Sequence, residues 1–110
     1  MGIRLEKPWR ALTPEAVAAL PAELGVFQLG DADGRVVRIG YAGGRSLFGL
    51  RGELRAAIGT PGATSFRTEV TAQYMSRFEE LLMVHQADFG SLPEGNAAET
   101  RRRLGRLSPG

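Results

Sequence analysis

The chain has 110 residues, 43% of them hydrophobic, which is enough for one domain with a single modest core and too few for a second domain. It contains no cysteine, which excludes disulfides, thiolate metal sites and cysteine nucleophiles. No apolar run approaches the roughly 20 residues that cross a bilayer, and the N-terminus lacks a signal-peptide core, so we expect a cytoplasmic protein with no membrane contact.

The positive charge of the chain is carried by arginine, because Lys7 is its only lysine. A formal net charge of +2 does not by itself indicate a nucleic-acid partner. The planar guanidinium fork does suit phosphate oxygens. Arginines gather in two stretches, at positions 35, 38, 45, 51 and 55 and again at 101, 102, 103 and 106. Two interpretations stay open for the second stretch: it contacts a nucleic-acid backbone, or it is a solvated end of the chain.

The first predicted elements are a short helix and a β-hairpin. Thr13 as N-cap, Pro14 in the first helical position and Glu15 in the first turn predict a helix that ends before Pro21, within a helical extension over residues 1–24. Residues 25–30 and 35–40 are rich in β-branched and apolar side chains and flank an Asp-Ala-Asp-Gly turn, which predicts a hairpin. Their imperfect alternation is typical of strands covered on both faces.

The second half of the chain predicts two helices and one strand. Leucines at 47, 50 and 54 and Ile58 recur at helical spacing over residues 46–58. Residues 65–71 alternate like a third strand, and residues 72–87 form a long helix, in which we expect Tyr74 to pack, as we do for Trp9. Residues 97–110 are a basic tail that we expect to be loosely ordered. The pattern predicts an α+β fold, a small three-stranded antiparallel sheet flanked by helices.

Several short motifs in this order resemble the GIY-YIG nuclease domain. They are the triplets Gly25-Val26-Phe27 and Arg38-Ile39-Gly40, Arg51 in the following helix, the pair Glu79-Glu80 in the long helix, and Asn96. The resemblance covers residues 25–96, the predicted core of the domain. It implies a GIY-YIG-like fold and an endonuclease that hydrolyses phosphodiesters with one weakly bound divalent cation, Mg²⁺ or Mn²⁺. It also implies a nucleic-acid partner, with DNA preferred over RNA.

The resemblance assigns a role to each matching position. Arg51 corresponds to the arginine that stabilises the phosphate, and Glu79 or Glu80 to the metal ligand, with both left open. Asn96 corresponds to an asparagine that supports the site. Such an oxygen donor suits a hard cation that keeps most of its waters, and a guanidinium can meet charge that develops on phosphate oxygens.

Two positions depart from the family pattern. Phe27 stands where the first tyrosine is expected, and it has no hydroxyl with which to orient water. Arg38 stands where the second is expected, and it can bind phosphate but cannot act as a general base. Tyr41 lies three residues later, and two interpretations stay open for it: a phenol of the site, or a solvent-exposed turn residue.

The predicted nucleic-acid contacts surround the loop after the hairpin. Gly43 and Gly44 let the backbone approach a ligand closely, and Arg38, Arg45 and Arg55 are the predicted phosphate contacts. No P-loop or dinucleotide fingerprint is present, so we expect no nucleotide cofactor. Two hypotheses follow: a Mg²⁺-dependent endonuclease, or a catalytically degenerate module of the same fold that binds nucleic acid or a protein partner.

Overall fold

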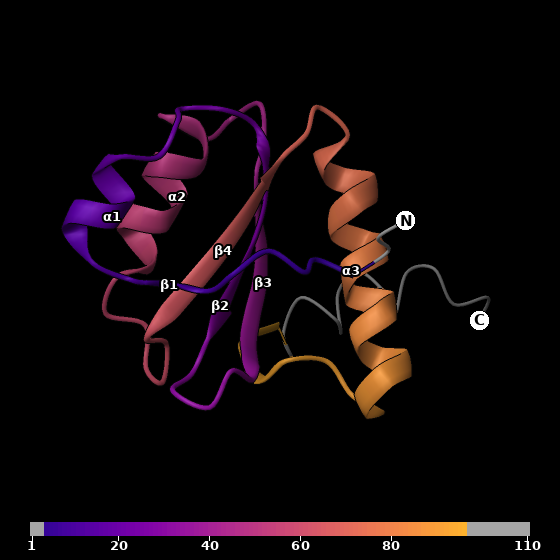
Figure 1. Ribbon diagram of the computed structural model, residues 1–110. Helices are drawn as coiled ribbons and strands as arrows, with labels where there is room; N and C mark the ends of the chain where they lie inside the picture. Colours follow the sequence, from indigo (N-terminus) through magenta and orange to yellow (C-terminus); the bar gives the residue numbers. More distant parts are fainter. Residues whose placement is uncertain (1–3, 97–110) are drawn as a thin grey trace.

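A computed structural model describes residues 4–96 of the chain, which fold into one sheet with helices on both of its faces (Figure 1). The four-stranded antiparallel sheet has the order β1-β4-β2-β3. No helix in the described part is both long and apolar enough to cross a membrane. In chain order the elements are β1 (Arg10–Ala11), α1 (Pro14–Ala18), β2 (Gly25–Gly30), β3 (Val36–Ala42), α2 (Gly49–Ala57), β4 (Ser65–Val70), α3 (Tyr74–Phe89) and the 3-10 turn η1 (Glu94–Asn96).

The predicted α+β class is confirmed, but the predicted strand count is wrong by one. The three predicted strands correspond to β2, β3 and β4, with bounds that shift by at most two residues. The fourth, β1, pairs Arg10 with Phe66 and Ala11 with Ser65 at the outer edge of β4. A two-residue strand carries no alternating pattern, so periodicity cannot reveal it.

Each face of the sheet has its own hydrophobic core. Helices α1 and α2 cover one face and α3 covers the other (Figure 1). All six residues of β2 are buried, since this strand lies between β3 and β4 and under both layers, which explains its weak alternation. The first core contains Val17, Leu20, Phe27, Leu29, Ala42, Leu50, Leu54, Ala57 and Phe66, and the second contains Leu5, Val26, Ile39, Phe78, Leu81 and Leu82.

The N-terminal segment is part of this domain rather than a helical extension. Helix α1 begins as predicted, with the Thr13 hydroxyl accepting from the Ala16 backbone amide at 3.2 Å. Helical structure within residues 4–24 is confined to α1, and Leu5 is buried in the core beneath α3. The basic tail, residues 97–110, lies outside the described residues.

The free edge of β3 is closed by a side chain that substitutes for a neighbouring strand. The Ile39 backbone amide donates to Asn96 Oδ1 at 2.7 Å, and Asn96 Nδ2 donates to the Ile39 carbonyl at 2.8 Å. Asn96 is fully buried. Exposed strand edges are sites of unwanted pairing. The Asn96 amide provides hydrogen-bond partners for the backbone of Ile39 and covers the middle of β3.

We predict that Asn96→Ala lowers the free energy of unfolding by about 2–4 kcal/mol, because two buried backbone groups of Ile39 lose their partner at roughly 1–3 kcal/mol each. Urea denaturation followed by circular dichroism measures the change. Gln86→Ala, which removes an exposed amide from α3, is the control and should change stability by less than about 0.5 kcal/mol. Equal stability of the two variants would show that Asn96 does not hold this edge.

Candidate functional site

A polar hollow of about 750 Å³ lies beside the motif strands, where the C-terminal half of β3, the glycine loop, α2 and the start of α3 meet. We call it the basic pocket. Five of the predicted site residues line it, Arg38, Tyr41, Gly43, Gly44 and Arg45. The complete lining is Phe27, Arg38, Gly40, Tyr41, Gly43, Gly44, Arg45, Ser46, Glu53, Tyr74 and Met75.

Two stacked tyrosines form the aromatic wall of the basic pocket. The rings of Tyr41 and Tyr74 have centroids 5.8 Å apart and planes 18° apart, and Tyr41 also meets the edge of Phe78 at 4.9 Å. A side chain at Gly43 would come within 2.7 Å of the Tyr74 ring. The Gly44 amide donates to the Tyr74 hydroxyl at 3.3 Å. Tyr74 therefore packs, as predicted, and also fixes the loop, a role that its helical spacing did not reveal.

The glycine loop presents Arg45 to solvent. The Gly43 amide donates to Ser46 Oγ and the Ser46 amide donates to the Gly43 carbonyl, both at 3.0 Å, which closes a tight turn. Arg45 lies at the tip of this turn and is exposed. Within residues 4–96, neither Arg45 nor the half-buried Glu53 across the pocket forms an ion pair. Their charges are therefore available to a ligand.

The two positions of the motif tyrosines differ in their access to the pocket. Phe27 is only 3% exposed and its ring lies over Gly40 on the neighbouring strand, in the core beneath α1 and α2. Arg38 is half-buried and its Nη1 donates to the Gly95 carbonyl at 3.0 Å. Arg38 thus lines the pocket and at the same time ties β3 to η1.

The predicted phosphate arginine, Arg51, does not line the basic pocket. It lies on the other flank of α2 and lines a second hollow of about 410 Å³ together with Arg55. Glu53 is the residue of α2 that lines the basic pocket. Residues 51 and 53 are about 200° apart around a helix, so they flank the buried stripe of Leu50 and Leu54 on opposite sides. Arg55 follows Arg51 by one turn and is likewise outside the basic pocket.

The predicted acid pair is divided between two environments. Glu80 is exposed and accepts from Arg77 Nη1 at 2.6 Å, in an ion pair that Arg77 shares with Glu69. Glu79 is half-buried and follows Met75, a pocket residue, by one helical turn. Of the two, Glu79 therefore has the position nearer to the basic pocket.

The sequence analysis missed the carboxylate that does line the pocket, Glu53. The sequence could have indicated it, because Glu53 borders the buried stripe of α2 as closely as Arg51 does. Arg51 was chosen because it matches the arginine of the family motif. In the described part of the chain no group of three or more His, Asp or Glu side chains is placed to hold a metal ion. A cation in the basic pocket would be bound by one carboxylate, with water or phosphate oxygens as its other ligands.

Comparison with known proteins places the chain in a family. A family model described as a domain of unknown function (DUF7508) matches residues 3–88. The chain belongs to this DUF7508 family. No curated protein and no solved structure matches it. The DUF7508 match spans all eleven residues that line the basic pocket and ends before η1, which carries Asn96.

A third hollow, of about 570 Å³, lies between the sheet and the C-terminal half of α3. Its central cation is Arg67, which stacks on Trp9 at 4.1 Å and donates to Gln28 Oε1 at 2.8 Å, and whose pKa is lowered by burial. At its rim Arg4 donates twice to Asp88, and these hydrogen bonds lower the pKa of the Asp88 carboxyl. The protein itself pairs these three charged groups, whereas Arg45 and Glu53 form no ion pair within the described residues.

We predict that Gly43→Ala lowers the free energy of unfolding by about 1–3 kcal/mol, as overpacking does, because the new methyl group collides with Tyr74. Loss of the near-ultraviolet circular dichroism signal should accompany it, since the two tyrosines no longer stack. Gly44→Ala is the matched control: only the Tyr74 hydroxyl lies near, at 3.9 Å, so stability should change by less than about 1 kcal/mol. If the two variants behave alike, the loop and the aromatic wall do not fix each other.

Proposed function

We propose that this chain is a GIY-YIG-like domain that binds nucleic acid, DNA in preference to RNA, by holding backbone phosphate in the basic pocket. The observation that carries the proposal is the convergence of Arg38 and Arg45 on one hollow beside a glycine loop and two tyrosines. The arginines provide charged hydrogen-bond donors whose fork geometry matches phosphate oxygens. The phenol rings offer a face and a hydroxyl to the adjoining sugar or base.

The arrangement of the motifs supports the GIY-YIG-like assignment. The two triplets lie on adjacent antiparallel strands, with Phe27 opposite Gly40 and Leu29 opposite Arg38. The pocket opens between these strands, the helix that follows them and the last long helix, as the resemblance implies. The functional groups have exchanged positions: the arginine comes from β3 and the loop instead of α2, and the phenols come from Tyr41 and Tyr74.

Phosphodiester hydrolysis is a second candidate activity, and the presence of Glu53 in the same pocket favours it. Bound through this carboxylate, Mg²⁺ or Mn²⁺ supplies Lewis-acid polarisation of the phosphate and of a water molecule. The chain itself would hold the phosphate with Arg38 and Arg45 and orient the water with the Tyr41 hydroxyl. Affinity for the cation would be low without nucleic acid, because a single carboxylate makes a poor cage.

The binding proposal predicts that Arg45→Ala weakens binding to a fluorescein-labelled 12-nucleotide single-stranded DNA about tenfold, the loss of roughly 1.4 kcal/mol expected for one charged phosphate contact. Fluorescence anisotropy measures the dissociation constant. Affinity of the wild-type protein should also fall as salt rises, because phosphate contacts release counterions.

Arg35→Ala provides a charge-matched control, since Arg35 is an exposed arginine on the hairpin turn that does not line the basic pocket. It should change the dissociation constant less than twofold. Equal losses in both variants would mean that net charge, not this pocket, governs binding, and a wild-type affinity independent of salt would contradict phosphate recognition.

The hydrolytic candidate predicts cleavage of single-stranded, duplex or branched DNA in Mg²⁺ or Mn²⁺ that stops when EDTA is added. Glu53→Gln should reduce the cleavage rate at least about 100-fold, because it removes the cation's only protein charge in the pocket. Glu79→Gln should have a smaller effect, and Glu80→Gln none, since Glu80 pairs with Arg77 outside the pocket.

Denaturing gel electrophoresis of end-labelled DNA measures these rates. Cleavage that survives Glu53→Gln would contradict the assignment of the cation to this carboxylate. Binding without any cleavage in either metal would remove the hydrolytic candidate and leave the binding proposal in place.

A further inference from the structure

Phe48 combines a disfavoured backbone conformation with a solvent-exposed ring. Its φ of 62° is the only positive value at a non-glycine position in residues 4–96. The side chain is 63% exposed, and its neighbour Leu47 is 79% exposed. Large side chains are rare in left-handed backbone, and such outliers concentrate at functional sites. Packing in the hydrophobic core therefore does not explain why a phenylalanine occupies this position.

The fold requires the left-handed turn but not the phenylalanine. Gly49 is also left-handed, and a side chain there would meet the backbone of Glu23 at 2.5 Å. The Leu50 amide donates to the Glu23 carbonyl at 2.8 Å, and the Gly52 amide donates to the Phe48 carbonyl at 3.2 Å. All of these contacts use backbone atoms, so asparagine, which tolerates left-handed backbone, could make them with less strain.

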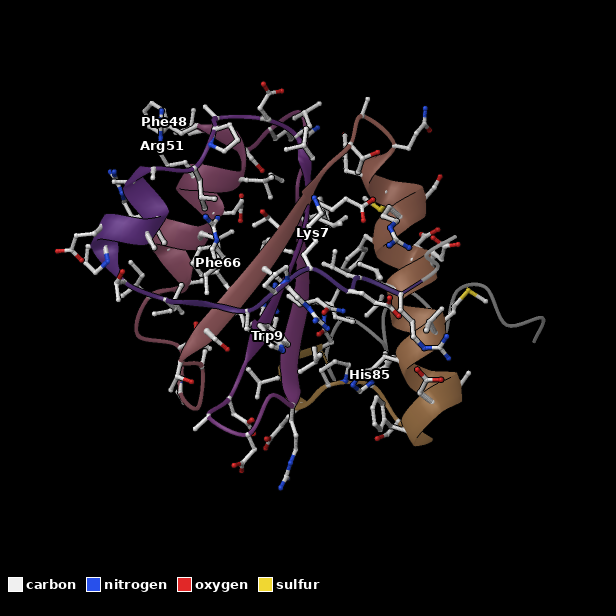
Figure 2. The ribbon with its side chains drawn as sticks, in the orientation of Figure 1. Lys7, Trp9, Phe48, Arg51, Phe66 and His85 are labelled. Atoms are coloured by element: carbon white, nitrogen blue, oxygen red, sulfur yellow. The ribbon has the colours of Figure 1, made fainter. Side chains whose placement is uncertain are left out.

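The exposed ring lies beside two cations. Phe48 lines the second hollow together with Leu47, Arg51 and Arg55, and Figure 2 shows Phe48 and Arg51 next to each other at one end of the molecule. Neither arginine forms an ion pair in the described part of the chain. Phe48 is close in sequence to the basic pocket, because only Arg45, Ser46 and Leu47 separate it from Gly44.

We infer that Phe48 stacks on an unpaired base of a bound nucleic-acid strand, while Arg51 and Arg55 contact the phosphates beside that base. This inference rests on the proposed function and names its substrate class: single-stranded segments, frayed ends or branches rather than blunt duplex. Aromatic stacking with flanking cations is the common means of binding single strands. The loop would thus hold phosphate on one side and a base on the other.

The charge distribution favours a nucleic acid over a protein as the occupant of this surface. Arg45, Arg51 and Arg55 are spaced along the loop and one helix face, which suits a backbone with regular negative charge. The two apolar side chains, Leu47 and Phe48, are too few to form the apolar centre of a stable protein interface, which buries about 800 Å² per partner.

The test compares Phe48→Asn with wild type in anisotropy titrations against a labelled 12-nucleotide single strand and the corresponding blunt duplex. We expect about a tenfold loss of affinity for the single strand, as for one stacked base, with less than a twofold change for the duplex. The melting temperature should stay equal or rise by a few degrees, since strain is relieved. Phe48→Trp should retain affinity for the single strand.

Phe89→Asn is the matched control, because Phe89 is 70% exposed at the far end of α3; its affinity should equal that of wild type. Unchanged affinity in Phe48→Asn, while Arg45→Ala still weakens binding, would overturn this inference alone. Unchanged affinity in both would overturn the proposed function with it. A melting temperature that falls by more than a few degrees would identify Phe48 as a packing residue and also overturn the inference.

Discussion

Burial of Leu50 and Leu54 against the sheet is the constraint on which the arrangement of charges depends. Both side chains are fully buried, so α2 has a fixed rotation. That rotation sends Glu53 to the basic pocket and Arg51 and Arg55 to the opposite flank. Because residues 51 and 53 are about 200° apart around the helix, only a rotation of roughly half a turn would exchange the two charges. The packing of the core therefore determines which charged residue of α2 faces the basic pocket.

The basic pocket is assembled from distant parts of the chain that stabilise one another. Tyr41 from β3 stacks on Tyr74 from α3, and Tyr74 accepts a hydrogen bond from the loop at Gly44. Arg38 extends the assembly to η1 by donating to the Gly95 carbonyl. Such mutual support keeps side chains in place before a ligand arrives, and preorganisation lowers the cost of binding. The exposed turn at Arg45 is the part left free to contact a partner.

Periodicity and turn chemistry predicted the helices and the three long strands, because each has a repeating pattern or a clear turn between elements. They could not predict β1, which is two residues long. Motif spacing grouped the loop around Gly43 with Arg51, but the two lie at different hollows. The sequence alone does not show which flank of a buried helical stripe faces a given hollow. Glu53 was missed for the same reason. The strain at Phe48 is a backbone property with no sequence signal.

Chemical-shift mapping tests the central claim, that phosphate binds in the basic pocket, most directly. The account predicts that, when a short single-stranded oligonucleotide is titrated into ¹⁵N-labelled protein, the largest amide shifts occur in residues 43–48 and then on the flank of α2 that carries Arg51. Shifts concentrated instead around Arg67 and His85, in the hollow beneath α3, would contradict it. So would a spectrum that does not change at saturating oligonucleotide.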